Sequence, residues 1–284
     1  MTGDIANSRL ALGGLRVFYV LLVLFLYAPI LLLAIFSFND NPTPAFPLQS
    51  FTLRWYEQFL SNQQLIGALR NSLIVATISS VFAVALGLAA SFLLVRRRFV
   101  GKTAVSALML SPLVIPYLVF GIALLILFSA VDELLTSTLG VYIGLGLHAV
   151  VVGHVVVSIP YTILTIVPRL EGLEISLEEA SRDLGAGPAE TFRRVTLPLL
   201  MPSIVSSFLI AFTLSFDEFA IASFLTGRSV TWPVYLFAQL RFPVLLPQLI
   251  AVSVIVMTLS IAVVVATEVF RRRAERRLDF APPA

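Results

Sequence analysis

Residues 71–95 read NSLIVATISSVFAVALGLAASFLLV, a run of 25 residues without a charged side chain. About 20 apolar residues in a helix, at about 1.5 Å per residue, cross the ~30 Å hydrocarbon core of a bilayer. Lipid offers no hydrogen bonds to the backbone, and an α-helix satisfies its own amides within the segment. This run therefore predicts a membrane-spanning helix and an all-α membrane protein.

Further uncharged runs lie on both sides of this stretch, at 17–39, 103–131, 134–168, 195–216 and 242–267. The first half of 134–168 is rich in Thr, Ser and Gly, which predicts a loop before its span. We expect a polytopic protein with six transmembrane helices, at 16–38, 68–95, 104–129, 145–167, 202–225 and 248–270. The transmembrane domain then covers 16–270, between an N-terminal segment at 1–15 and a tail at 271–284.

The composition excludes several classes of function. Only 12% of the residues are charged, against about 25% in soluble domains, so the composition excludes an ordinary soluble globular domain. The chain has no cysteine, which excludes thiolate catalysis, cysteine zinc sites and disulfides. His148 and His154 are the two histidines, and we expect them to be packed side chains with no metal between them. No H-E-x-x-H or G-x-S-x-G motif occurs, and Gly101-Lys102 lacks the upstream glycine of a P-loop, so we expect no enzyme activity in this chain.

The basic residues predict the orientation in the membrane. With six spans, fifteen of the 19 Lys and Arg residues fall on the side of the two termini, and only Arg54, Arg70, Arg228 and Arg241 fall on the other. Cytoplasmic loops carry the excess of Lys and Arg, so we expect both termini in the cytoplasm. The positive charge flanks spans and forms no aromatic-interleaved patch, which argues against nucleic acid as a partner.

The longest cytoplasmic connection, 169–201, is predicted to form a helix, a turn and a second helix. Ser176 and Glu179 have the spacing of a capping box at a helix start. Gly185 stands where a left-handed residue would end that helix. Pro188 suits the first turn of the next helix, where its missing N–H costs nothing. The charged outer face and narrow apolar face of this connection suit docking into a groove on a cytoplasmic partner.

The same connection carries a spaced motif. Glu179-Ala180-Ser181 is followed after three residues by Gly185, and after nine more by Val195-Thr196-Leu197-Pro198. This pattern resembles the EAA loop of the permease subunits of bacterial binding-protein-dependent ABC importers. The resemblance implies the type I importer permease fold and a loop that inserts into a cleft on an ATPase subunit. It assigns ATPase coupling to Glu179, Ala180, Gly185, Leu197 and Pro198.

Other stretches are similar to the second permease of spermidine/putrescine importers: Phe51 to Tyr56, Ser111-Pro112, Ser215 to Phe219 and Phe224 to Gly227. Leu113 departs from that family, which often has an acid there. The resemblance implies a bacterial inner-membrane complex with a second, related permease, two ATPases that bind ATP and Mg²⁺, and an extracytoplasmic substrate-binding protein. No cofactor is expected in this chain, and membrane lipid surrounds it.

Asp217 and Glu218 are adjacent acids inside the predicted fifth span, where each costs about 2.5–3.5 kcal/mol and usually faces a cavity or a partner. We expect them to line the pathway of a cationic substrate, with Ser215 and Tyr117 as further lining residues. The alternative is that one acid caps a broken helix or pairs with an arginine. Trp55 and Tyr56 are assigned to contact with the binding protein, with a membrane-interface anchor as the alternative.

The functional expectation is therefore a permease of an ATP-driven importer for a polyamine or a related amine. The same importer class with another solute, such as an amino-acid derivative, an opine or an aminophosphonate, is the first alternative. A secondary transporter fits less well, because such proteins usually carry more spans with inverted repeats.

Overall fold

The computed structural model describes the backbone of residues 2–279 and the side chains of residues 14–262 and 265. The described part is helical, and six of its helices are long and apolar enough to cross a membrane. The chain divides into two compact units, 1–62 with 239–259 and 63–238 with 260–284, and each is described by itself. The predicted all-α class and number of spans are confirmed.

The first unit contains α1 (Thr2–Phe36), α2 (Arg54–Ser61), η3 (Pro243–Leu245) and the beginning of α12 (Leu246–Asp279). The segment between α1 and α2 closes on itself through a single bridge between Asn39 and Phe51. Gln248 Nε2 donates to Gln58 Oε1 at 2.9 Å and joins α12 to α2. Helix α1 includes residues 2–15 of the predicted N-terminal segment, and residue 1 lies outside the described part. Helix α12 continues into the predicted tail, of which residues 280–284 lie outside the described part.

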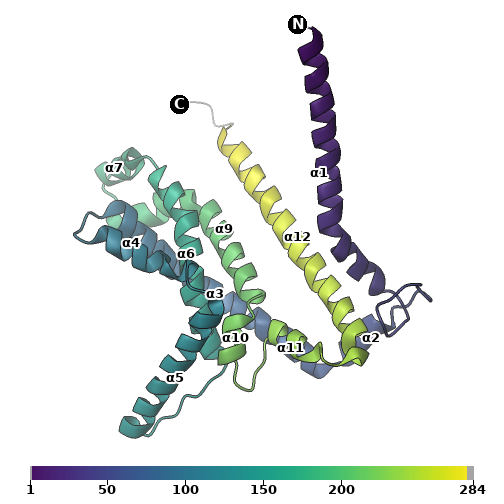
Figure 1. The fold of residues 1–284 in the computed structure, drawn as a ribbon. Helices are drawn as coiled ribbons and strands as arrows, with labels where there is room; N and C mark the ends of the chain where they lie inside the picture. The colour runs from purple at the N-terminus through teal and green to yellow at the C-terminus, as the bar shows by residue number, and fades with distance from the viewer. Residues whose placement is uncertain (1, 280–284) are drawn as a thin grey trace. The chain divides into compact units, whose positions relative to one another are not determined.

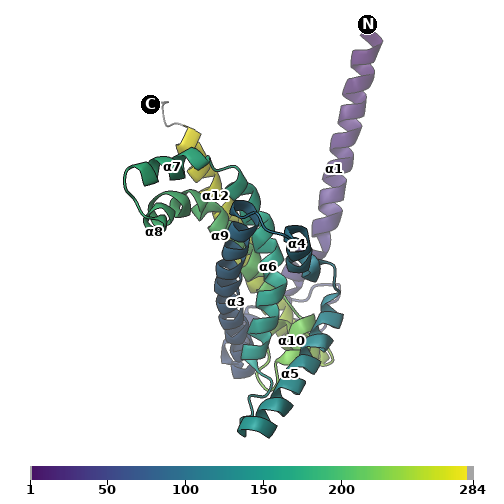
Figure 2. The same cartoon turned by 90° about the vertical axis from the view of Figure 1, so that its left-hand side faces the viewer.

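The second unit is built on three long helices, α3 (Gln63–Arg96), α6 (Leu147–Glu171) and α9 (Leu197–Phe216), which pack against one another (Figures 1 and 2). The buried face of α3 is made mostly of small residues spaced three or four apart: Ala68, Ser72, Val75, Ala76, Ser79, Ala83, Gly87, Ala90 and Ser91. Small residues let membrane helices approach closely. The helix α7 (Ile175–Asp183) lies at one end of this unit, and the far end of α5 (Tyr117–Leu139) lies at the other.

The predicted third span at 104–129 is wrong in its position. The chain forms α4 (Lys102–Leu110), then η1 (Ser111–Leu113), and begins the spanning helix α5 only at Tyr117. Pro112 and Pro116 lack an amide hydrogen, and proline disfavours helix at the residue before it. Both helices are apolar, so the uncharged run does not show the break between them. At its other end α5 continues through Asp132 and stops at Gly140, which has φ +67°.

The predicted fifth span at 202–225 is also wrong, because two helices occupy it. Helix α9 ends at Phe216, and a short helix, α10 (Ala220–Leu225), follows after three residues. The residues between them include both of the predicted pathway acids. Helix α11 (Trp232–Gln239) follows α10 along the chain.

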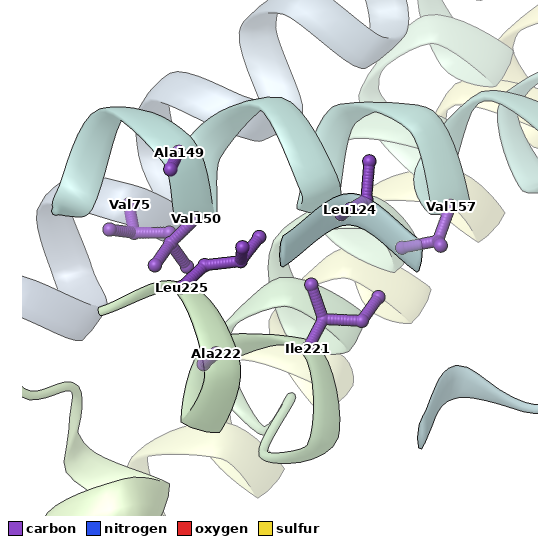
Figure 3. Packing of buried hydrophobic residues seen from close by; sticks show 8 residues of the cluster. All are labelled: Val75, Leu124, Ala149, Val150, Val157, Ile221, Ala222 and Leu225. Atoms are coloured by element: carbon purple, nitrogen blue, oxygen red, sulfur yellow. The ribbon is translucent and has the colours of Figure 1, made fainter. Parts of the chain in front are cut away.

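The short helix α10 is part of the core of the second unit. Ile221, Ala222 and Leu225 have no exposed surface and pack against residues of α3, α5 and α6 (Figure 3). Glycines of the surrounding helices make room for it. A Cβ at Gly121 would lie 3.1 Å from the Ile221 Cα, and one at Gly153 would lie 2.8 Å from the Ile221 Cγ2.

We predict that Gly87→Ala lowers the stability of the permease fold and that Gly67→Ala, also in α3, does not. A Cβ at Gly87 would lie 2.5 Å from Thr162 Cγ2 and 2.6 Å from its Cβ, whereas one at Gly67 meets no atom within 4 Å. Overpacking costs about 1–3 kcal/mol, while alanine in a helix gains about 1 kcal/mol over glycine. Thermal unfolding of the purified protein in detergent should show a midpoint several degrees lower for Gly87→Ala alone. Equal midpoints for the two variants would contradict the close α3–α6 contact.

Candidate functional site

The break between α9 and α10 is held by the carboxylate of Glu218. Its Oε1 accepts the backbone N–H of Ile221 at 2.8 Å, and its Oε2 accepts that of Ala222 at 2.9 Å. The first N–H groups of a helix have no partner within the helix, and burial without one costs free energy. Glu218, 6% exposed, therefore caps α10 inside the core.

A chain of polar side chains links this carboxylate to α6, α9 and α3. His154 Nε2 lies 3.1 Å from Glu218 Oε2, and His154 Nδ1 lies 2.7 Å from Ser215 Oγ. Ser215 Oγ lies 2.8 Å from Ser79 Oγ. An ionised carboxylate can only accept hydrogen bonds, so Nε2 of the imidazole donates to it. All four side chains are buried, and we call them the break cluster.

Asp217 differs from its neighbour. Its side chain is exposed, and within the described part of the chain its carboxylate has no hydrogen bond or ion pair. It is the C-cap residue of α9, with its backbone N–H donating to Thr213 O at 3.2 Å. The two adjacent acids therefore have different surroundings: the Glu218 carboxylate is bonded to backbone N–H groups and His154, whereas the Asp217 carboxylate has no partner among the described residues.

Tyr117, the fourth predicted pathway residue, begins α5. Its hydroxyl lies 3.2 Å from that of Tyr161 on α6, and its side chain is half-buried. The structure thus brings Ser215 and Glu218 together in one network, with Asp217 beside it.

His154 is the member of the break cluster that sequence reasoning treated only as a packed side chain. The only signal in the sequence is a histidine in an apolar helix, and its partners are more than 60 residues away along the chain. His148, the other histidine, lies 3.0 Å from Gly144 O through Nε2. Among the described residues, no group of three or more His, Cys, Asp or Glu could hold a metal ion.

The connection 169–201 forms the expected helix–turn–helix. Helix α7 ends in a Schellman turn, in which the N–H of Gly185, with φ +90°, donates to Arg182 O at 2.8 Å and the N–H of Ala186 donates to Ser181 O at 3.1 Å. Helix α8 (Pro188–Thr191) starts on Pro188, as predicted. The predicted capping box is wrong: α7 begins one residue before Ser176, its N-cap is Glu174, and no side chain caps it.

The predicted coupling residues lie along the outside of this connection and at the start of α9. Glu179, Ala180, Gly185 and Pro198 are exposed, and Leu197 is half-buried. A groove beside them is lined by Leu177, Ala180, Ser181, Leu184, Gly185, Ala186, Glu190, Arg194 and Val195. Leu184 is 90% exposed. Between α8 and α9 the chain forms a π-helix, η2 (Phe192–Thr196), in which the Leu197 N–H reaches back five residues to Phe192 O.

The two aromatic residues of α2 both make internal hydrogen bonds. Trp55 is buried, and its Nε1 donates to Asn39 O at 2.8 Å. The Tyr56 hydroxyl lies 2.7 Å from Ser37 Oγ. Arg54 lies over the Trp55 ring at 4.3 Å and pairs with Asp40 at 3.0 Å. The side chains fix α2 to the end of α1, and contact with a binding protein stays a prediction.

Comparison with known proteins decides the family. The family described as binding-protein-dependent transport system inner membrane component matches residues 83–276. The chain belongs to this family. It is the permease of a binding-protein-dependent ABC importer, a multi-pass protein of the inner membrane.

The permease is similar to curated polyamine-transport permeases. It is 32% identical over 266 residues to the spermidine/putrescine transport system permease protein PotC of Escherichia coli, covering 93% of this chain and 95% of PotC. It is 37% identical over 222 residues to the putrescine transport system permease protein PotI of the same organism, covering 78% and 77% of the two chains. The resemblance to the second permease of spermidine/putrescine importers is therefore confirmed.

Solved structures show the same fold. A chain of a bacterial ABC transporter involved in the import of the acidic polysaccharide alginate superposes with a TM-score of 0.76 at 15% identity, covering 95% of the permease and 97% of that chain. A chain of the MetNI methionine ABC transporter gives a TM-score of 0.53 at 19% identity, covering 74% and 95%. The ABC-importer permease fold is confirmed.

We predict that Glu218→Gln destabilises the permease and that Asp217→Asn does not. A glutamine has one acceptor oxygen for two backbone N–H groups, and a buried N–H left without a partner costs about 1–3 kcal/mol. Exposed substitutions away from such contacts usually change stability by less than about 0.5 kcal/mol. Thermal unfolding of the purified variants, with wild type alongside, measures both. A lower midpoint for Asp217→Asn than for Glu218→Gln would show that the roles are reversed.

Proposed function

We propose that this permease imports a polyamine, such as spermidine or putrescine, in a complex driven by ATP. The observation that carries the proposal is the 32% identity to PotC along almost the whole of both chains. The exposed carboxylate of Asp217 beside a helix break supports it, because a free anion at the end of a transmembrane helix suits a substrate with several positive charges.

Electrostatics make Asp217 the residue of the pair that a cation can use. At an effective dielectric constant near 20, a unit charge about 4 Å away is worth roughly 4 kcal/mol before desolvation is subtracted. The Glu218 carboxylate already accepts two backbone N–H groups and faces His154, so a ligand would have to compete with these groups. Ser215 belongs to the break cluster and Tyr117 packs against the core formed by α10, so both are further polar groups of the proposed pathway.

The proposed partners follow from the exposed surfaces and the family. The outer surface of α7 and α8, with Glu179, Ala180 and the apolar groove, would dock on one of two cytoplasmic ATPases, which bind ATP and Mg²⁺. The exposed Leu177 and Leu184 supply apolar area for such contact. A second permease would complete the pathway, and an extracytoplasmic binding protein would deliver the solute, with α2 on the side it approaches.

Uptake by a strain that lacks the chromosomal copy of this permease tests the substrate. We expect wild type to restore uptake of labelled spermidine, Asp217→Asn to reduce it about tenfold, equivalent to about 1.4 kcal/mol, and Asp217→Glu to retain most of it, because only the first change removes the charge. Purification through an affinity tag on the permease should recover the same amount of ATPase with each variant. If the wild-type permease restores uptake of neither spermidine nor putrescine, the importer would be reassigned to another small solute.

Cysteine labelling tests the proposed orientation. The native chain has no cysteine, so single cysteines introduced at the exposed positions Ser50, Ser229 and Val100 report independently. Because Lys and Arg concentrate on the side of the termini, an impermeant thiol reagent added to intact cells should label Ser50→Cys and Ser229→Cys. Val100→Cys should react only after the membrane is permeabilised. Labelling of Val100→Cys from outside would overturn the orientation.

A further inference from the structure

One carboxylate oxygen at the cytoplasmic end of the second unit joins three elements. Glu178 Oε1 lies 3.0 Å from Arg96 Nη2, at the last residue of α3. The same oxygen accepts the Thr196 hydroxyl at 3.1 Å, at the last residue before α9. Glu178 itself is on α7. The proposed docking helix is therefore tied to the ends of two long helices at one point.

This junction differs from an ordinary surface ion pair. The side chains of Arg96 and Glu178 are 19% and 15% exposed, and Thr196 is buried. By contrast, Arg194 and Glu190 pair one helical turn apart with side chains 76% and 45% exposed, and such pairs contribute little. Within the described chain, the bond to Glu178 is also the only one made by the Arg96 guanidinium, whose Nε is buried without a partner.

Two further contacts hold the same elements together. The rings of Phe92 on α3 and Phe192 on η2 meet edge to face, with centroids 5.4 Å apart. The hydroxyls of Ser181 on α7 and Thr191 on α8 lie 3.2 Å apart. The docking helix, the turn after it and the end of α3 thus form one bonded cluster, in which Glu178 has the central position.

The two helices joined by Glu178 meet again at the break cluster. Ser79 on α3 and Ser215 on α9 are hydrogen-bonded at 2.8 Å. They lie 17 and 19 residues from Arg96 and Thr196, or roughly 26 and 29 Å along the two helices at 1.5 Å per residue. Helices α3 and α9 therefore connect the Glu178 carboxylate to the Ser79–Ser215 pair over similar lengths. This pair lies beside Asp217.

We propose that Glu178, with Arg96, is a positioning residue that makes α3 and α9 move together with α7, so that ATP hydrolysis is converted into movement at the break. This inference rests on the proposed function, because it requires an ATPase docked on α7. Glu179, next to it on the helix and exposed, contacts the ATPase, whereas Glu178 faces inward and transmits the movement. Loss of Glu178 leaves docking intact and separates hydrolysis from transport.

The test measures transport and hydrolysis in the same reconstituted complex. The complex in proteoliposomes, with its binding protein and labelled spermidine, gives the number of solute molecules imported per ATP hydrolysed. We expect Glu178→Ala and Arg96→Gln to recover a normal amount of ATPase and to hydrolyse ATP within about twofold of wild type, but to import at least about fivefold less per ATP. The charge-exchanged pair Arg96→Glu with Glu178→Arg should regain part of that ratio.

A matched control lies in the same region. Arg97→Gln removes the charge next to Arg96, in a pocket that both arginines line together with Glu178, but leaves the Arg96–Glu178 pair in place, so it should keep the wild-type ratio. A normal ratio in Glu178→Ala and Arg96→Gln would overturn the inference, and so would loss of the ATPase from both, which would make the pair part of docking. A wild-type complex without an ATPase or without ATP-dependent uptake would instead refute the proposed function.

Discussion

Inside a membrane, every backbone N–H that a helix exposes at a break must find a partner in the protein, because lipid offers none. Glu218 meets this requirement where α9 ends, by accepting the N–H groups of Ile221 and Ala222. The direction of α10 depends on these bonds. So does the core formed by Ile221, Ala222 and Leu225 against α3, α5 and α6. The position of the break in turn leaves Asp217 exposed at the end of α9.

The same cluster shows how polar and small residues divide the work of packing. Small side chains on α3 and α6, such as Gly87 and Ala149, allow close contact between backbones but give little directional preference. The hydrogen bonds from Ser79 to Ser215, and from Ser215 to His154, fix which turn of each helix faces which. Ser215 on α9 and His154 on α6 are buried, and an unpaired polar group in apolar surroundings is costly.

Much of this architecture follows from the sequence, and the exceptions have physical reasons. The run 71–95 predicts α3 because a long uncharged stretch has one low-energy state in lipid. Gly185 predicts the end of α7 because few other residues adopt a positive φ without strain. The break before Tyr117 and the one after Phe216 escape prediction because the chain stays apolar across them, so no change of composition marks them. The partnership of His154 with Glu218 joins distant parts of the chain, and Glu178 is distinguished from Glu179 only by its neighbours in space.

The π-helix η2 sets the rotation of the connection around the axis of α9. Each residue of an α-helix turns the chain by about 100°, and a π-turn holds one residue more than an α-turn in its hydrogen-bonded ring. Without that extra residue in 192–196, the cytoplasmic helices α7 and α8 would swing by about a quarter of a turn around the axis of α9. Glu178 would then point away from Arg96. The length of this short segment is therefore an angular adjustment, and a one-residue deletion there would re-aim the cytoplasmic helices while the transmembrane helices kept their places.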